Sequence, residues 1–123
     1  MNEEFGILFK NEALKYEEEL LEQLTGVIDP ELGIDIANLG LVYEVDMDEA
    51  GKVEVIMTLT TAGCPLADFI DSDVRYQLAN FDKITEIDIK VVFKPHWDLS
   101  RISRFARIAL GIPSDFIPNY INI

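Results

Sequence analysis

Hydrophobic residues recur at three- and four-residue steps between Ala13 and Ile28, and glutamates fill most of the positions between them. Such spacing places an apolar stripe along one side of a helix. We therefore predict an amphipathic helix with an acidic outer face. Residues 29–33 follow, and because Pro30 disfavours a helical conformation at Asp29, they predict a turn. A plain helix stop is the alternative interpretation.

Two segments, 41–47 and 53–59, alternate between apolar and polar residues. Residues 48–51 between them are typical of a turn, so the pair predicts an antiparallel hairpin. A helical pattern at 66–78 then precedes a third alternating segment at 84–93, and this order predicts a crossover that places the third strand parallel to the second. The residues expected to face the core include Leu41, Tyr43, Val45 and Met47, then Phe69 of the helix, and Ile87, Ile89, Val91 and Phe93.

Helical spacing returns near the end of the chain, where Asp98 or Ser100 is expected to cap a last helix that Gly111 closes. Its inward residues are expected to be Ile102, Phe105 and Ala109, and its outer stripe Arg101, Arg104 and Arg107. The simplest interpretation of this stripe is a solvated helix face. An acidic partner or a second protomer could also use it.

The predicted order is helix, strand, strand, helix, strand, helix. It favours an α+β fold of two layers, with the helices on one face of a small mixed three-stranded sheet. A chain of 123 residues has the size of a single domain. Within this domain we expect an N-terminal arm at 1–12, a core at 13–112 and a tail at 113–123.

The charge of the chain limits its partners, because 23 acidic residues against 10 basic ones give a net charge of -13. Such a field repels nucleic acid and anionic membrane surfaces. Residues 1–50 carry fourteen acids and two lysines, whereas residues 94–110 have a net charge of +3. The sequence opens without a basic and apolar leader and has no apolar run of about 20 residues, so we expect a cytoplasmic protein in a reducing compartment.

The single cysteine of the chain lies in a loop that runs from Thr60 and Thr61 to Gly63, Cys64 and Pro65. Gly63 permits a close approach to the backbone, and Pro65 suits the first position of a helix. A helix N-terminus stabilises a thiolate by about 0.3–1 kcal/mol, so we expect modest activation of Cys64. The alternative is an inert buried cysteine.

Short blocks of the sequence follow one another in a distinctive order. They are residues 29–33, Ile36 with 39–43, 58–61 with 63–66, Trp97, and 109–111. Together they resemble the SufT and PaaD-like family, long catalogued as domain of unknown function 59, over residues 14–112.

The resemblance implies an iron–sulfur cluster assembly domain fold and a role in maturing iron–sulfur proteins, without enzymatic turnover. The functional cysteine of the family falls on Cys64, and its acidic turn falls on Asp29 and Glu31. The chain ends without the cysteine-rich tail of PaaD-type members, which favours the shorter SufT-like branch. His96 stands where relatives often have proline, so no role is carried over to it.

One cysteine cannot hold a cluster alone, since iron–sulfur clusters usually take four cysteine ligands. A symmetric homodimer would bring two thiols, and small-molecule thiols or the cysteines of a client could complete the set. We therefore expect a labile cluster or iron shared between chains, with no tightly bound cofactor. Asp29, Glu31 and His96 are candidate oxygen or nitrogen ligands, although carboxylates in turns are usually caps.

Three functions remain open at this stage. The first is a carrier that uses Cys64 to deliver iron or a cluster to client apoproteins, with the iron–sulfur assembly machinery as partner. The second is an adaptor in the same process that binds no metal. The third is a thiol enzyme, which would require a base beside the sulfur, and His96 is the single histidine.

Overall fold

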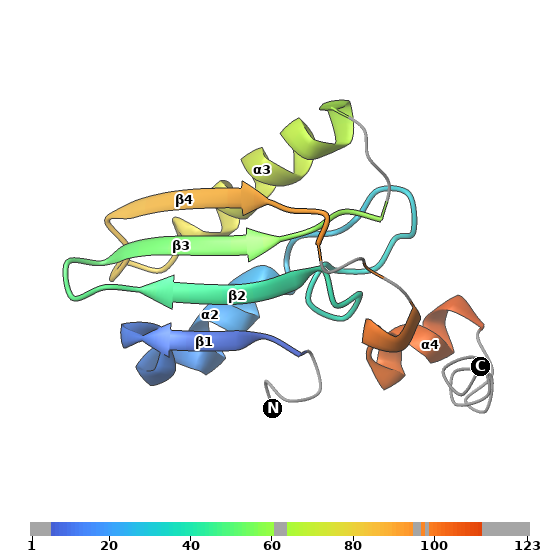
Figure 1. Ribbon diagram of the computed structural model, residues 1–123, viewed down its shortest axis with the longest axis horizontal. Coiled ribbons are helices and arrows are strands. Elements are labelled where there is room, and N and C mark those ends of the chain that lie inside the picture. The colour runs from blue at the N-terminus through green and yellow to red at the C-terminus, as the bar shows by residue number, and fades with distance from the viewer. Residues whose placement is uncertain (1–5, 61–63, 95–96, 98, 112–123) are drawn as a thin grey trace.

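The computed structural model describes residues 6–60, 64–94, 97 and 99–111 (Figure 1), without the side chains of Cys64, Pro65 and Leu99. Its elements are β1 (Leu8–Asn11), η1 (Glu12–Tyr16), α2 (Glu17–Leu24), β2 (Val42–Met47), β3 (Lys52–Met57), α3 (Cys64–Leu78), β4 (Glu86–Val91), η2 (Leu99–Arg101) and α4 (Arg104–Leu110).

The strands form one sheet in the order β1-β2-β3-β4. β2 and β3 are antiparallel, which confirms the predicted hairpin, and β4 is parallel to β3, which confirms the predicted crossover. α2 and α3 lie on one face of this sheet (Figure 1), so the predicted two-layer α+β class is also confirmed.

The prediction of three strands is wrong, because part of the predicted N-terminal arm forms β1, which pairs in parallel with β2. Phe9 is 3% exposed and belongs to the core, whereas Leu8 is 54% exposed. Asn11 donates to the carboxylate of Asp46 at 2.8 Å and ties the end of the strand to β2. A strand of four residues is too short to display a reliable alternation in the sequence.

The first predicted helix is shorter than its apolar spacing suggested. It opens as a 3-10 turn in η1, continues as α2 and ends at Leu24. Val27 is fully buried, but it lies outside the helix, where its carbonyl accepts from the Ile36 amide at 2.9 Å. Tertiary pairing thus replaces the helical hydrogen bond at this position.

Three aromatic residues that were predicted to face the core are partly or largely exposed. A register irregularity between Val42 and Glu44 turns the start of β2, so Val42 is fully buried and Tyr43 is half-buried. Phe69 of α3 is 50% exposed. Phe93 is also 50% exposed, because β4 ends at Val91.

Ion pairs cross the face of the sheet away from the helices. Their N–O distances are 3.0 Å for Lys10 with Glu44, 3.6 Å for Lys52 with Glu86 and 3.0 Å for Lys90 with Glu54. The hydrogen bond to Glu54, together with the charge of that carboxylate, raises the pKa of Lys90. This face is polar, as the alternation predicted.

The last helix begins later than predicted, at Arg104, and Ser103 is its N-cap: the Ser103 hydroxyl accepts from the Ala106 amide at 3.1 Å. Ser100 is therefore not the cap, and Asp98 lies outside the described residues. Gly111 ends the helix in a left-handed conformation, which confirms that prediction. The 3-10 turn η2 changes the helical phase before α4. Ile102 and Ala106 are consequently buried, whereas Phe105 is 58% exposed and Ala109 is exposed.

Candidate functional site

The acidic turn is built around a buried carboxylate. Asp29 is 1% exposed, and its Oδ1 accepts from the amides of Glu31 at 2.8 Å and Leu32 at 3.3 Å. The Gly33 amide donates to the Asp29 carbonyl at 2.8 Å, which closes the predicted turn. Because α2 already ends at Leu24, this turn is not a helix stop. The turn amides instead provide hydrogen-bond donors for the buried carboxylate of Asp29.

The second oxygen of Asp29 reaches the cysteine loop. Its Oδ2 accepts from the Thr60 hydroxyl at 3.3 Å, across a sequence separation of 31 residues. Thr60 follows the end of β3, so this hydrogen bond attaches the acidic turn to the first residue of the loop. The structure thus brings Asp29 and Thr60 together, while Glu31 is exposed at the surface of the turn.

Cys64 is the first residue of α3, and Pro65, which was expected at that first position, is the second. This confirms that the cysteine stands at the start of a helix, where the partial positive charge of the helix end favours an anion. Thr61 and Gly63 lie outside the described residues, as do the side chains of Cys64 and Pro65. His96 also lies outside them.

A buried segment at residues 34–41, here named the core loop, leads from the acidic turn to β2. Asp35 is 7% exposed and accepts from both the backbone amide and the side-chain amide of Asn38, at 2.9 and 2.7 Å. Asn38 in turn accepts from the amide of Ser103 at 2.7 Å and, through its side chain, from the Ser103 hydroxyl. The N-cap of α4 is therefore part of the same hydrogen-bond network as the core loop.

Two further side chains from the end of the chain bind carbonyl groups of the core loop. The indole of Trp97 donates to the Leu39 carbonyl at 2.6 Å, and Nε of Arg101 donates to the Gly40 carbonyl at 2.8 Å. Sequence patterns did not predict these anchors, because residues 34–39 have no regular period and contacts across 58 and 61 residues leave no local signal. The spacing of Asp35 and Asn38 could have indicated only the local side-chain cap between those two residues.

Arg101 does not belong to a solvated stripe with Arg104 and Arg107, so that part of the prediction is wrong. Its guanidinium lies over the ring of Tyr43, 4.3 Å from the centroid, and its second nitrogen donates to the Gly6 carbonyl at 3.3 Å. Arg104 is exposed on α4. Arg107 is partly buried, and its Nε has no hydrogen-bond partner within the described part of the chain.

Potential ligand sites are few in the described part of the chain. Among those residues, no three His, Cys, Asp or Glu side chains gather in a way that could hold a metal ion.

None of the described helices has both the length and the apolar character needed to cross a membrane.

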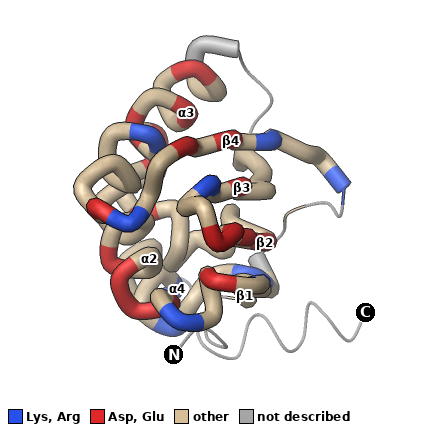
Figure 2. Tube along the Cα trace, turned by 90° about the vertical axis from the view of Figure 1, so that its left-hand side faces the viewer, with Lys and Arg blue, Asp and Glu red and all other residues tan. Residues whose placement is uncertain are grey.

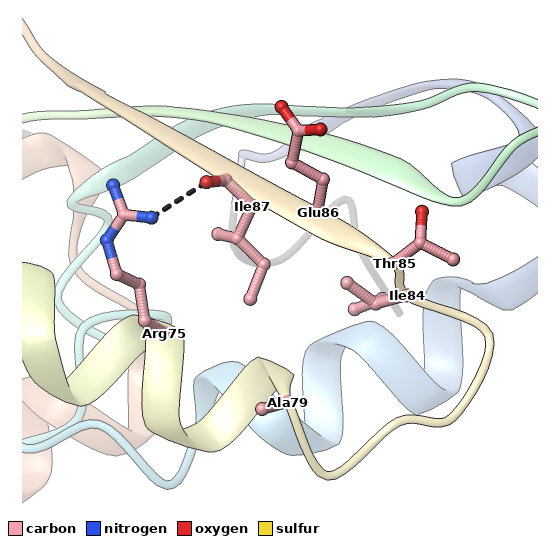
Figure 3. A pocket seen from close by; sticks show the side chains of 6 residues that line it. All are labelled: Arg75, Ala79, Ile84, Thr85, Glu86 and Ile87. Carbon is pink, nitrogen blue, oxygen red and sulfur yellow. Dashed lines mark hydrogen bonds between the residues drawn. The ribbon is translucent and has the colours of Figure 1, made fainter.

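A pocket of about 340 Å³ lies between α3 and β4, away from the acidic turn (Figure 3). Arg75 stands at its edge, where it donates to the Ile87 carbonyl at 2.7 Å and to the carboxylate of Asp71 at 2.7 Å. Both contacts are internal. We therefore interpret this arginine as a cap on the terminal strand of the sheet.

The charges are unevenly distributed over the molecule. Figure 2 shows acidic residues along α2 and α3. The first turn of α2 alone carries Glu17, Glu18 and Glu19, whereas α4 carries Arg104 and Arg107 and no acid. The contrast in charge between residues 1–50 and 94–110 of the sequence is thus also a contrast between α2 and α4 in the fold.

Comparisons with known proteins agree with this architecture. The model of the family described as "Iron-sulfur cluster assembly protein" matches residues 17–91. The Fe-S protein maturation auxiliary factor YitW of Bacillus subtilis is 50% identical over 101 residues, which cover 82% of this chain and 97% of the relative. The Fe-S protein maturation auxiliary factor SufT of Staphylococcus aureus is 49% identical over 86 residues, covering 70% and 98%.

A solved structure described as a domain of unknown function DUF59 from Bacillus anthracis is similar over most of the chain. It has a TM-score of 0.75 and 48% sequence identity, and the match covers 81% of this chain and 95% of that one. A family model that matches more than half of the chain, together with relatives near 50% identity over almost their whole length, identifies the family. The chain belongs to the iron–sulfur cluster assembly protein family.

Proposed function

We propose that this protein is an iron–sulfur maturation factor that carries iron or a labile iron–sulfur cluster to client apoproteins through Cys64. The observation that carries the proposal is the hydrogen bond between Asp29 and Thr60, because it fixes the start of the cysteine loop against a buried turn. The names of the relatives, which are maturation auxiliary factors, support the same role.

In this proposal some residues position the cysteine loop and one residue binds the cargo. Asp29 and Thr60 hold the loop, and Cys64 at the start of α3 supplies the thiolate that binds the cargo. One thiolate leaves three of the usual four cluster ligands to be supplied by others. A second copy of the chain, a small thiol or a client cysteine completes the set, so the cargo is held loosely and is released by ligand exchange.

A carrier suits the geometry better than a thiol enzyme. The buried carboxylate of Asp29 already accepts from two backbone amides and the Thr60 hydroxyl, so it is committed to structure. A general base needs a free acceptor within reach of the thiol. Glu31, exposed at the surface of the turn, is a candidate transient oxygen ligand for iron in this proposal. We place the protein in the reducing cytoplasm, with the assembly machinery and client apoproteins as partners.

Replacement of Cys64 tests the proposal directly. In cells that lack the wild-type chain, Cys64→Ser and Cys64→Ala should both fail to restore the activity of iron–sulfur enzymes, although the folded protein accumulates. Thr25→Ser, which keeps a hydroxyl at a position away from the loop, is the matched control and should restore activity. Full client activity with both Cys64 variants would instead support the adaptor, in which the chain binds partners without metal.

The reactivity of the thiol provides a second measurement on the purified protein. The rate of alkylation by iodoacetamide against pH reports an apparent pKa, and because the chain has one cysteine the signal has a single source. A helix start that favours thiolate predicts a value below that of a free cysteine, which is about 8.5. A value at or above this reference would count against an activated thiol.

A further inference from the structure

The outward side of α4 carries a surface that the Cys64 site does not use. We define the α4 face as Arg104, Phe105, Ile108 and Ala109, with Arg107 at its edge. Phe105 is 58% exposed and Ile108 is 72% exposed. Residues three and four positions apart are neighbours on a helix, so the two apolar side chains lie together. Single exposed hydrophobic residues need no explanation, but a helix of seven residues that turns two of its three large apolar side chains outward does.

The two arginines of this face differ from five other basic residues of the chain in their ion pairing. Ion pairs with acids engage Lys10, Lys15, Lys52, Arg75 and Lys90. Within the described ranges no such pair involves Arg104 or Arg107, even though acids outnumber bases by 23 to 10. Nε of Arg107 is buried and has no acceptor among the residues that the structure describes. A buried donor without an acceptor is costly, and a carboxylate is the partner that an arginine binds best.

We propose that the α4 face docks an acidic amphipathic segment of another protein. Its carboxylates pair with Arg104 and Arg107, and its apolar side chains cover Phe105 and Ile108. Charge complementarity identifies this occupant. Two copies of the α4 face would bring the arginines of each copy together, so a second copy docked through this same face is disfavoured.

The α4 face is built on a rigid support. Ser103 caps α4 and also binds Asn38, so the helix is anchored to the core loop immediately before the first residue of the face. Ala106, on the inner side of the helix, is fully buried. The proposal concerns partner choice and does not depend on Cys64, so it stands or falls separately from the carrier function.

The test uses the full chain and a fluorescent helix-forming peptide in which Glu and Leu repeat at four-residue steps. The same peptide with Lys in place of Glu is the charge control. Fluorescence anisotropy should detect binding of the Glu peptide, weakened by added salt, and amide NMR shifts should map it to residues 104–110. The double variant Arg104→Glu with Ile108→Ser should lower the affinity by at least about tenfold.

A matched double variant, Lys83→Glu with Leu14→Ser, makes an equivalent charge reversal and an equivalent apolar-to-serine change at exposed positions elsewhere, and it should bind like wild type. Unchanged thermal unfolding of both variants verifies that they are folded. Absence of binding, or equal binding of the Lys peptide, overturns the proposal. A concentration-dependent dimer that the α4 variant abolishes would identify a second copy as the occupant, and NMR contacts from residues 112–123 to Ile108 would identify the chain's own tail. Either result also overturns it.

Discussion

At the scale of single residues, the fold depends on a few positions where backbone and side chains of distant segments touch. Gly40 has a φ of 72°, a left-handed conformation that side chains disfavour. A Cβ at this position would overlap the carbonyl oxygen of Arg101. Gly33 has the same φ of 72°, yet a Cβ there would meet no atom within 4 Å. Substitution of Gly33 therefore tests backbone strain alone, whereas substitution of Gly40 tests backbone strain together with a steric clash.

We expect Gly40→Ala to destabilise the protein far more than Gly33→Ala. Both variants adopt a disfavoured φ, at a cost of about 1–3 kcal/mol, and Gly40→Ala must in addition push Arg101 away. Urea unfolding of the two variants measures the difference in the free energy of unfolding. Equal losses would mean that the contact between Gly40 and Arg101 is unimportant.

Asp29 offers a prediction about the candidate site. Asp29→Ala removes the acceptor of two turn amides and of the Thr60 hydroxyl, so we expect a loss of about 1–3 kcal/mol in the free energy of unfolding. Glu49→Ala, at an exposed turn position, is the control and should change stability by less than about 0.5 kcal/mol. If thermal unfolding finds the two variants alike, the carboxylate of Asp29 does not hold the turn together.

At the scale of elements, β1 is the strand that the sequence did not reveal. We expect Phe9→Ala to cost about 3–5 kcal/mol, because this ring is 3% exposed in the core. Leu8→Ala, at the neighbouring residue that is 54% exposed, should cost far less. Chemical denaturation of both variants checks the contrast. A similar small loss in each would indicate that β1 is not docked in solution.

The regular elements could be predicted because each segment is long enough to show its pattern of apolar and polar residues. The hairpin of β2 and β3, the helix α3 and the parallel β4 follow from alternation and helical spacing, and the ordered sequence blocks led to the family that the comparisons confirm. The acidic turn was also predicted from Pro30. The hydrogen bond between this turn and Thr60 was not predicted, because a contact across 31 residues leaves no local pattern in the sequence.

The errors have a common physical cause. Phe105 and Ala109 were assigned inward by assuming one continuous helix, whereas η2 breaks the phase before α4. Arg101 was read as a solvated charge, but its planar guanidinium stacks on Tyr43 and binds backbone carbonyls instead. Tertiary contacts of this kind decide orientation where local periods are short.

At the scale of the whole molecule, the net charge of -13 should make stability depend on salt. Raising NaCl from about 0.01 M to about 1 M shortens the screening length from about 30 Å to about 3 Å. Surface ion pairs contribute little, so relief of self-repulsion should dominate and raise the unfolding temperature. The double variant Glu18→Gln with Glu19→Gln should respond less to salt. A fall in the unfolding temperature would show that the ion pairs dominate.

The hydrogen bonds that anchor the core loop also determine when this loop can finish folding during synthesis. The carbonyls of Leu39 and Gly40 receive their donors from Trp97 and Arg101, which follow 58 and 61 residues later. At about 5–20 residues per second, a ribosome needs roughly 3–12 s to make that interval. The core loop of the nascent chain therefore cannot form these two hydrogen bonds until the end of the chain has been made. A fragment that stops at residue 91, where the family match ends, should lack both of them.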